Sequence, residues 1–242
     1  MKQFLLTVFL LVVLAASAGA LSPELIKAHK ASHQIGQEVL LLGGRGCTAT
    51  AIGPQALLTA THCEMPTDVL YVRGVEYPAT IVGRIRDEND HTIYLLQNIH
   101  FADYIDVSLT DPKEQGEDVF VFGNPGAWSD QFRKGYITGV KHDESLAGAL
   151  GVGMPDMTLF DLNTWHGDSG SAILNANGKI IAVLSTGEGQ VNPSDPSDNI
   201  VLTGAFVFAF KQGDLDRARG FSIANSAEYD KRVAEDTKKD KS

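Results

Sequence analysis

Residues 47–63 read CTATAIGPQALLTATHC, two apolar runs separated by the turn signal Gly53-Pro54. Short apolar or alternating runs between glycine, proline and asparagine residues continue along the chain from Glu38 onward. The further runs are Val39–Leu42, Val69–Val72, Ala79–Val82, Thr92–Leu96, Val119–Phe122, Gly135–Val140, Met157–Asp161, Ser171–Leu174, Lys179–Leu184 and Gly204–Phe210. About a dozen short runs at this spacing, with no long helical period between them, predict an all-β chain of two barrels or sandwiches.

Few segments have the composition of a helix or a long loop. Ser22–His33 predicts a short amphipathic helix, and Asn225–Lys238, which lacks Gly and Pro, predicts a C-terminal helix before a polar tail. Glu188–Asn199 is rich in Pro, Asp, Ser and Asn and predicts a loop. The polar stretch Tyr104–Gly116, interrupted by Pro112, is the expected linker between two halves of the chain.

The first 20 residues have the composition of a secretory signal. Lys2 precedes the apolar run Phe4–Ala16, and the small residues Ser17–Ala20 follow it. Cleavage is expected after Ala18 or Ala20, and the alternative is an uncleaved segment that anchors the protein in a membrane. The sequence therefore predicts a secreted or periplasmic protein with no stable membrane association after signal cleavage.

The composition excludes several classes of protein. With 20 Lys+Arg against 30 Asp+Glu, the net charge is −10, which argues against nucleic acid as a partner. A count of two cysteines excludes a disulfide-dense scaffold. We expect no metal and no cofactor, because C-x-x-C and H-E-x-x-H motifs are absent and His29, His33, His100 and His142 lack metal-ligand spacing.

Three places along the chain carry residues suited to nucleophilic catalysis. GDSGS at residues 167–171 sets Ser169 between glycines, which permit a tight turn with backbone N–H groups aimed at an oxyanion. His62 ends an apolar strand, and Asp90 lies just before another. Each also has an interpretation without catalysis. GDSGS can be a plain turn between strands, His62 a structural histidine and Asp90 a turn residue or strand cap. Together they supply a base, its orienting acid and a nucleophile in the order His, Asp, Ser.

These motifs make the chain resemble the trypsin-like (chymotrypsin-fold) serine proteases, from about Val39 to Phe210. Residues 47–63 are similar to the family's strand pair around the histidine, where many members have a disulfide, so the resemblance implies a Cys47–Cys63 bridge. Residues 116–126, 135–140 and 167–182 look closest to the bacterial HtrA-like and staphylococcal glutamyl endopeptidases. We expect no PDZ domain after Phe210.

The resemblance implies two six-stranded antiparallel β-barrels with a C-terminal helix. The expected domains are a signal peptide at 1–20, an N-terminal lead-in at 21–37, a protease domain at 38–224, and a helix and polar tail at 225–242. Within the protease domain, barrel one is expected at about 38–105 and barrel two at about 116–212.

The resemblance also assigns roles. Ser169 is the nucleophile, His62 the general base and Asp90 the orienting acid, with the backbone N–H groups of Gly167 and Ser169 as the oxyanion hole. Asp90 is chosen because the family's acid directly precedes an apolar–small–apolar–apolar strand. The alternative acid is Asp106, which precedes Val107-Ser108-Leu109.

One residue in this region departs from the family pattern. His91 stands directly after Asp90, at a position where the family prefers Leu or Ile.

The specificity pocket is less clearly indicated. Asn163 stands where trypsin-like members have an Asp at the pocket base, so a preference for Lys or Arg is not supported. Thr164 resembles a Thr of the glutamyl endopeptidases, but Leu184 stands where those enzymes need a His. We expect a neutral, moderately small pocket, with Ser185, Thr186 and Gly187 pairing with the substrate backbone. His166 either touches the substrate or is simply exposed.

Activation follows one of two routes. Many animal members release a new N-terminus that pairs with the Asp before the nucleophile, here Asp168, but no Ile-Val-Gly-Gly sequence precedes Cys47. The alternative is that Asp168 bonds to local groups, as in bacterial members, with no zymogen step.

We expect a secreted serine endopeptidase that acts on protein or peptide substrates as a monomer. One alternative is a catalytically silent protease-fold module that binds a partner. Another is a serine esterase of a different fold, but this would need a G-x-S-x-G elbow and the order Ser, acid, His. In GDSGS the second Gly comes one position too early, and His62 precedes Ser169.

Overall fold

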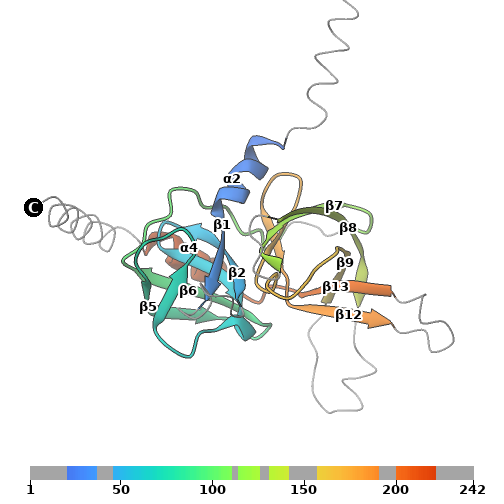
Figure 1. The fold of residues 1–242 in the computed structure, drawn as a ribbon. Coiled ribbons are helices and arrows are strands. Elements are labelled where there is room, and N and C mark those ends of the chain that lie inside the picture. The colour runs from blue at the N-terminus through green and yellow to red at the C-terminus, as the bar shows by residue number, and fades with distance from the viewer. Residues whose placement is uncertain are drawn as a thin grey trace, which may run out of the picture.

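The computed structural model describes residues 21–36, 46–110, 114–125, 131–141, 157–190 and 200–221. The expected signal peptide, the run Val39–Leu42 and the expected helix and tail at 225–242 lie outside the described residues. The described chain is mostly β-strand, with two short α-helices, in two units packed side by side (Figure 1). The predicted all-β class is confirmed. No helix within the described ranges is long and apolar enough to cross a membrane.

The first unit is a closed antiparallel barrel with the strand order β1-β2-β3-β6-β5-β4. Its strands are β1 (Ser32–Gly36), β2 (Cys47–Gly53), β3 (Ala56–Ala60), β4 (Val69–Val72), β5 (Ala79–Arg86) and β6 (His91–Gln97). β1 pairs with both β2 and β4 and so closes the barrel. The structure differs here from the expected boundaries, which placed residues 32–36 in a lead-in outside the barrel. The sequence SHQIG is too polar to indicate a strand, but both edges of its backbone are paired.

A helix precedes the barrel, as predicted from the sequence. α2 (Pro23–Ala31) begins after Ser22, whose Oγ accepts a hydrogen bond from the Leu25 N–H at 3.2 Å, and Pro23 occupies the first turn. The helix buries its apolar face, Leu25, Ala28 and Ala31, and packs against β1 and β2. It ends before the predicted His33 because Ser32 already begins β1.

The second unit is a sheet of seven antiparallel strands in the order β11-β10-β7-β8-β9-β13-β12. Its strands are β7 (Asp118–Gly123), β8 (Gln131–Lys141), β9 (Met157–Asp161), β10 (Ala172–Leu174), β11 (Ile180–Val183), β12 (Thr186–Gln190) and β13 (Ile200–Phe206). Among the described strands, the expected second barrel is thus an open half-barrel of seven strands, where a closed barrel of six was expected. Its two end strands, β11 and β12, are consecutive in the chain and are separated by Leu184 and Ser185.

The last described helix, α4 (Gln212–Gly220), follows the second unit in sequence but packs against β2 of the first barrel (Figure 1). Leu215 and Ala218 are its buried residues. The main core therefore extends from the first barrel into α4 and onto one face of the second unit, through residues such as Phe122 and Ile180. A second, smaller core fills the half-barrel with Val119, Val121, Ile137, Phe160, Leu162, Ile173, Ile181, Ala182 and Ala205.

Candidate active site

The pairing of β3 with β6 brings the predicted base and acid together. In this antiparallel ladder the last pair is Ala60 with His91, so the residues after β3 lie beside those before β6. His62 is in the short 3₁₀ helix Thr61–Cys63 that follows β3, and Asp90 directly precedes β6. A strand register within one barrel therefore fixes their proximity.

Three hydrogen bonds join the two segments. The Thr61 N–H donates to the carbonyl of Asp90 at 2.9 Å, and the His62 N–H donates to Oδ1 of the Asp90 carboxylate at 2.9 Å. Nδ1 of His62 lies 2.8 Å from Oδ2 of the same carboxylate. Because a carboxylate accepts hydrogen bonds, this contact places the proton of the neutral ring on Nδ1 and leaves Nε2 as an acceptor.

The surroundings of Asp90 keep its side chain ionised. Burial alone raises the pKa of this carboxyl, but the hydrogen bonds from the His62 side chain and backbone lower it more, and Ser185 adds a smaller hydrogen bond. The pKa of Asp90 therefore lies below its ordinary value. Its side chain is 21% exposed and that of His62 is 43% exposed, so the imidazole remains accessible to a substrate.

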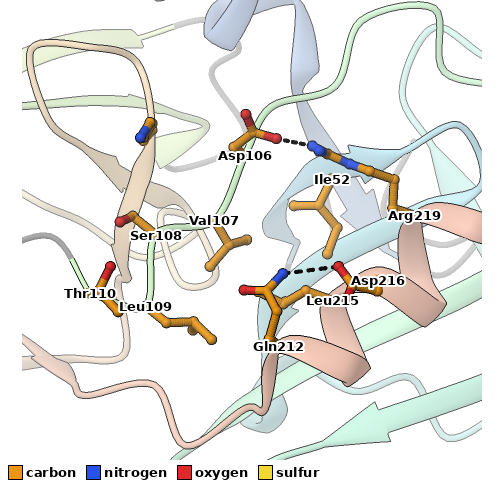
Figure 2. A pocket seen from close by; sticks show the side chains of 11 residues that line it. Ile52, Asp106, Val107, Ser108, Leu109, Thr110, Gln212, Leu215, Asp216 and Arg219 are labelled. Atoms are coloured by element: carbon orange, nitrogen blue, oxygen red, sulfur yellow. Dashed lines mark hydrogen bonds and ion pairs between the residues drawn. The ribbon is translucent and has the colours of Figure 1, made fainter.

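The alternative acid, Asp106, lies away from His62. Its backbone carbonyl accepts a hydrogen bond from the Ile180 N–H at 2.9 Å. Its carboxylate forms an ion pair with Arg219 of α4 (Figure 2). This pair borders a cleft of about 380 Å³ between α4 and residues 106–110. Neither His62 nor Ser169 lines the cleft, which is therefore separate from the candidate site.

The turn with Ser169 is hydrogen-bonded to the first barrel. The Thr48 N–H on β2 donates to the Ser169 carbonyl at 2.8 Å, and the Thr48 hydroxyl donates to the Gly167 carbonyl at 2.9 Å. The Thr59 hydroxyl on β3 donates to the carbonyl of Thr48 at 2.8 Å. Since Thr59 shortly precedes His62, these bonds place the Ser169 turn against the strands that lead to the histidine.

Gly170 is required by this close approach. Its φ is +82°, in the left-handed region that favours glycine. A Cβ at this position would overlap the hydroxyl of Thr59 and the carbonyl of Thr48. The glycine after the serine therefore allows the turn to touch the first barrel.

Asp168 is buried completely and has a local partner. The guanidinium of Arg133 on β8 donates to its two carboxylate oxygens at 2.6 and 2.5 Å. The Trp165 N–H also donates to Oδ2 of Asp168 at 2.8 Å. A buried carboxylate needs such pairing, and the paired side chain fixes the backbone between Gly167 and Ser169.

The backbone N–H groups of Gly167 and Ser169 make no hydrogen bond to the described part of the chain. Gly167 has a φ of +103°, which glycine adopts without strain. Within the same ranges the Ser169 hydroxyl has no hydrogen bond to His62. Such contacts are often long in enzymes without substrate and tighten when the substrate binds.

The predicted specificity residues lie around the same turn. Asn163 is exposed, and its carbonyl accepts from Arg133 at 3.2 Å. The hydroxyls of Thr164 and Thr203 lie 2.9 Å apart. Thr186 and Gly187 belong to β12, an end strand that pairs only with β13 among the described residues, and Ser185 directly precedes it. His166 is exposed and contacts the ring of Trp165 edge-on.

A disulfide joins Cys47 and Cys63, as the resemblance implied. It links the start of β2 to the residue after His62 and so restrains the loop with the histidine. Among the described residues, no group of three or more His, Cys, Asp and Glu side chains is placed to hold a metal ion.

Sequence reasoning missed two residues that position the site. Arg133, the partner of Asp168, lies in a strand whose side chains alternate between exposed and inward positions, and nothing in QFRKGYITG marks it. Thr48 lies in a predicted strand and nothing in the sequence marks it further, yet it bonds to both Gly167 and Ser169. The one sequence signal for a partner of Asp168 is the lack of an Ile-Val-Gly-Gly start, which leaves its carboxylate in need of another basic group.

Comparisons with known proteins agree with this geometry. A family model, the trypsin-like peptidase domain, matches residues 47–183. A search of curated proteins finds no significant relative by sequence.

Among solved structures, the chain is similar to the Rv3671c protease of M. tuberculosis. An alanine mutant of that protease in its inactive form has a TM-score of 0.57 and 19% identity, covering 81% of this chain and 90% of that chain. The inactive form of the protease has a TM-score of 0.56 and 18% identity, covering 81% of this chain and 92% of that chain. Its active form has a TM-score of 0.55 and 18% identity, covering 77% of this chain and 79% of that chain. At this identity the similarity shows a common fold.

Proposed function

Because this chain belongs to the trypsin-like peptidase family, we propose that it is a secreted serine endopeptidase with the triad His62, Asp90 and Ser169. The observation that carries the proposal is the 2.8 Å contact between Nδ1 of His62 and Oδ2 of Asp90. It lies in the barrel against which the Ser169 turn is hydrogen-bonded. Its substrates are proteins or peptides.

The proposed reaction is acyl transfer through a covalent intermediate. The Ser169 Oγ attacks the scissile carbonyl carbon while Nε2 of His62 removes the hydroxyl proton. The imidazolium then gives this proton to the leaving amine as the C–N bond breaks. Water, deprotonated by the same Nε2, hydrolyses the acyl-enzyme and restores Ser169. Asp90 holds the ring in the required tautomer and stabilises its charged form.

The oxyanion of each tetrahedral intermediate would be held by the N–H groups of Gly167 and Ser169. Both groups lack a hydrogen-bond partner within the described residues, so they are available to a ligand. Each such donor contributes about 3–4 kcal/mol to the stabilisation of the transition state. The Arg133–Asp168 pair supports this arrangement because it fixes the residue between the two donors.

This pair also supports activity without a zymogen step. The Asp168 carboxylate already accepts three hydrogen bonds from local donors, two from Arg133 and one from the Trp165 N–H. A newly released N-terminus therefore has no role as its counter-ion.

Substrate is proposed to bind as an added strand along Ser185, Thr186 and Gly187. This fits the end position of β12, whose second edge is unpaired among the described strands. Asn163 and Thr164 would line a neutral pocket, since neither side chain carries a charge.

Export from the cytoplasm is supported by the disulfide, because such bonds persist in oxidising compartments. The signal peptide expected at residues 1–20 is the means of export that we propose.

A library of internally quenched peptides tests the proposed activity. The mature protein is expected to cleave internal peptide bonds, with a preference for uncharged side chains before the scissile bond. Ser169→Ala is expected to lower kcat by about 10⁵–10⁶-fold. No cleavage by the wild-type protein would favour the silent binding module, and a strong preference for Arg or Lys would contradict the pocket assigned to Asn163.

A further inference from the structure

A second Asp–His pair, which the proposed mechanism does not use, lies in the turn that contains Asp90. Nδ1 of His91 is 2.7 Å from Oδ2 of Asp87. The two side chains are 0% and 2% exposed, so no substrate can reach them. Charged groups are rarely buried this completely unless they are paired, and these two side chains pair with each other.

The Asp87 carboxylate accepts four hydrogen bonds. Its Oδ1 accepts from the backbone N–H groups of Asn89 at 2.9 Å and His91 at 3.1 Å. Its Oδ2 accepts from His91 Nδ1 and from the Ala209 N–H at 2.9 Å. The Asp87 N–H in turn donates to the His91 carbonyl at 3.1 Å. Residues 87–91 are thereby closed into a fixed turn, with Asp90 inside it.

His91 contributes one side-chain hydrogen bond to this arrangement. Because its Nδ1 faces a carboxylate, the proton of the neutral ring is on Nδ1. Its Nε2 is buried and has no partner within the described residues. The ring packs against Phe208 and Phe210, with centroid distances of 4.7 and 6.0 Å. An apolar side chain would fill this space as well, so the bond to Asp87 is what distinguishes the histidine.

Asp90 needs this support because its backbone is unfavourable for a residue with a Cβ. Its φ is +66°, in the left-handed region. This conformation lets its side chain meet both the N–H and Nδ1 of His62. A turn free to relax would return Asp90 to the favoured region and draw its carboxylate away from the imidazole.

The turn is also joined to the chain that leaves the second unit. Asn89 Nδ2 donates to the Val207 carbonyl at 3.0 Å, and Asp87 accepts from Ala209. Residues 207–209 directly follow β13, which belongs to the sheet of the Ser169 unit. The acid of the first barrel is thus held relative to the unit that contains the nucleophile.

We propose that Asp87 and His91 are positioning residues that hold the turn so that the Asp90 carboxylate meets His62. This assignment rests on the proposed function, since it describes how the orienting acid of that site is placed. Asp87 and His91 act through Asp90 and touch neither the substrate nor the reacting atoms.

Four single variants test this assignment in the mature protein: Asp87→Asn, His91→Leu, His91→Asn and Glu88→Gln. Asp87→Asn keeps the shape of the side chain but cannot accept all four hydrogen bonds. His91→Leu fills the apolar space without the donor, whereas the amide of His91→Asn can restore a donor near Nδ1. Glu88→Gln is the control for Asp87→Asn, because it also removes one negative charge from this turn, but at an exposed position.

The readouts are kcat and KM for a peptide substrate, and the proton resonance of the His62 Nδ1–H. Asp87→Asn and His91→Leu are expected to lower kcat by about 10²-fold with KM within about twofold, as for a displaced catalytic group. Both should weaken or lose the Nδ1–H resonance. His91→Asn is expected to recover most of kcat, and Glu88→Gln to match the wild type.

Unchanged kcat in Asp87→Asn and His91→Leu, in a wild-type protein that is active, would overturn the assignment and leave the proposed function intact. Equal losses in His91→Asn and His91→Leu would also overturn it, since a restored donor to Asp87 would then not restore the placement of Asp90. If Asp87→Asn does not fold, the comparison of kcat between His91→Leu and His91→Asn still tests the positioning role. An inactive wild-type protein would instead contradict the proposed function.

Discussion

Arg133 and Asp168 form a buried two-pronged ion pair, with distances of 2.6 and 2.5 Å between the guanidinium nitrogens and the two carboxylate oxygens. The side chains are 16% and 0% exposed. The pair joins β8 to the turn of Ser169 and supplies locally the counter-ion that some family members obtain from a new N-terminus. The placement of the proposed oxyanion donors therefore depends on a residue of β8, which lies outside the turn that contains them.

Arg133→Met should damage both stability and activity. It leaves the Asp168 carboxylate buried without its main partner, which costs about 3–5 kcal/mol in the free energy of unfolding. In the folded fraction kcat is expected to fall by about 10²–10³-fold, as for the loss of one oxyanion donor. Urea denaturation and peptide hydrolysis measure the two effects.

Lys134→Met is the matched control for Arg133→Met. Lys134 is the next residue and pairs with Asp118, but these side chains are 52% and 55% exposed. Exposed pairs contribute about 0–1 kcal/mol, so the control should stay close to the wild type in stability and kcat. Similar losses in the two variants would show that burial of the Asp168 pair is not the cause.

Asp90→Asn should lower kcat by about 10⁴-fold with little change in KM. The amide cannot hold the His62 proton on Nδ1, so the ring adopts the wrong tautomer for accepting the Ser169 proton. Asp106→Asn should leave kcat unchanged, because Asp106 pairs with Arg219 and not with His62. Steady-state kinetics on one peptide compare the variants, and the reverse ranking would make Asp106 the acid.

Gly170→Ala should prevent the Ser169 turn from docking on the first barrel. The new methyl group would overlap Thr59 and Thr48, and the φ of +82° adds strain. We expect a loss of stability and of peptidase activity, measured by thermal unfolding and hydrolysis. Gly139→Ala is the control, because a Cβ there meets no atom within 4 Å. An active, stable Gly170→Ala variant would contradict the docking described here.

Stability should fall at acid pH because folding lowers the pKa of buried carboxyls. Burial raises the pKa of Asp87, but the hydrogen bonds from His91, Ala209 and Asn89 lower it more, so the pKa lies below its usual value. The pKa of Asp90 is lowered in the same way, with burial outweighed by the bonds from His62. Such groups stabilise the fold fully above their unfolded pKa of about 3.9, and this contribution is lost as pH falls through the folded pKa.

Urea denaturation between about pH 5 and pH 2 should therefore show a decreasing free energy of unfolding. Asp87→Asn cannot titrate at this position, so its free energy of unfolding should depend less steeply on pH in this window. A slope equal to that of the wild type would mean that Asp87 does not contribute to it.

The fold and the position of His62 could be predicted because both follow from local patterns. The apolar runs at 47–52 and 56–60 became β2 and β3, and Gly53-Pro54 separates them as expected. The resemblance assigns Asp90, because the family's acid directly precedes a strand of this kind, and the β3–β6 register brings Asp90 to His62. The order of residues along the neighbouring strands β3 and β6 therefore places Asp90 beside His62.

Other features depend on tertiary contacts that no local pattern reports. Residues 188–190 fall in a predicted loop because the stretch Glu188–Asn199 as a whole is rich in Pro, Asp, Ser and Asn, yet they belong to β12 and pair with β13. α4 was not predicted, since QGDLDRARG has few apolar residues, and burial of Leu215 and Ala218 on the barrel stabilises it. Asp106 could be separated from Asp90 only when its partner Arg219, which is distant in sequence, was known.

The most direct test of the central claim is labelling of the mature protein with a fluorophosphonate probe, which reacts with an activated serine. The wild type is expected to label at Ser169, with labelling abolished in Ser169→Ala and strongly slowed in His62→Ala. A folded wild-type protein that does not label, or labelling that persists in Ser169→Ala, would contradict the account.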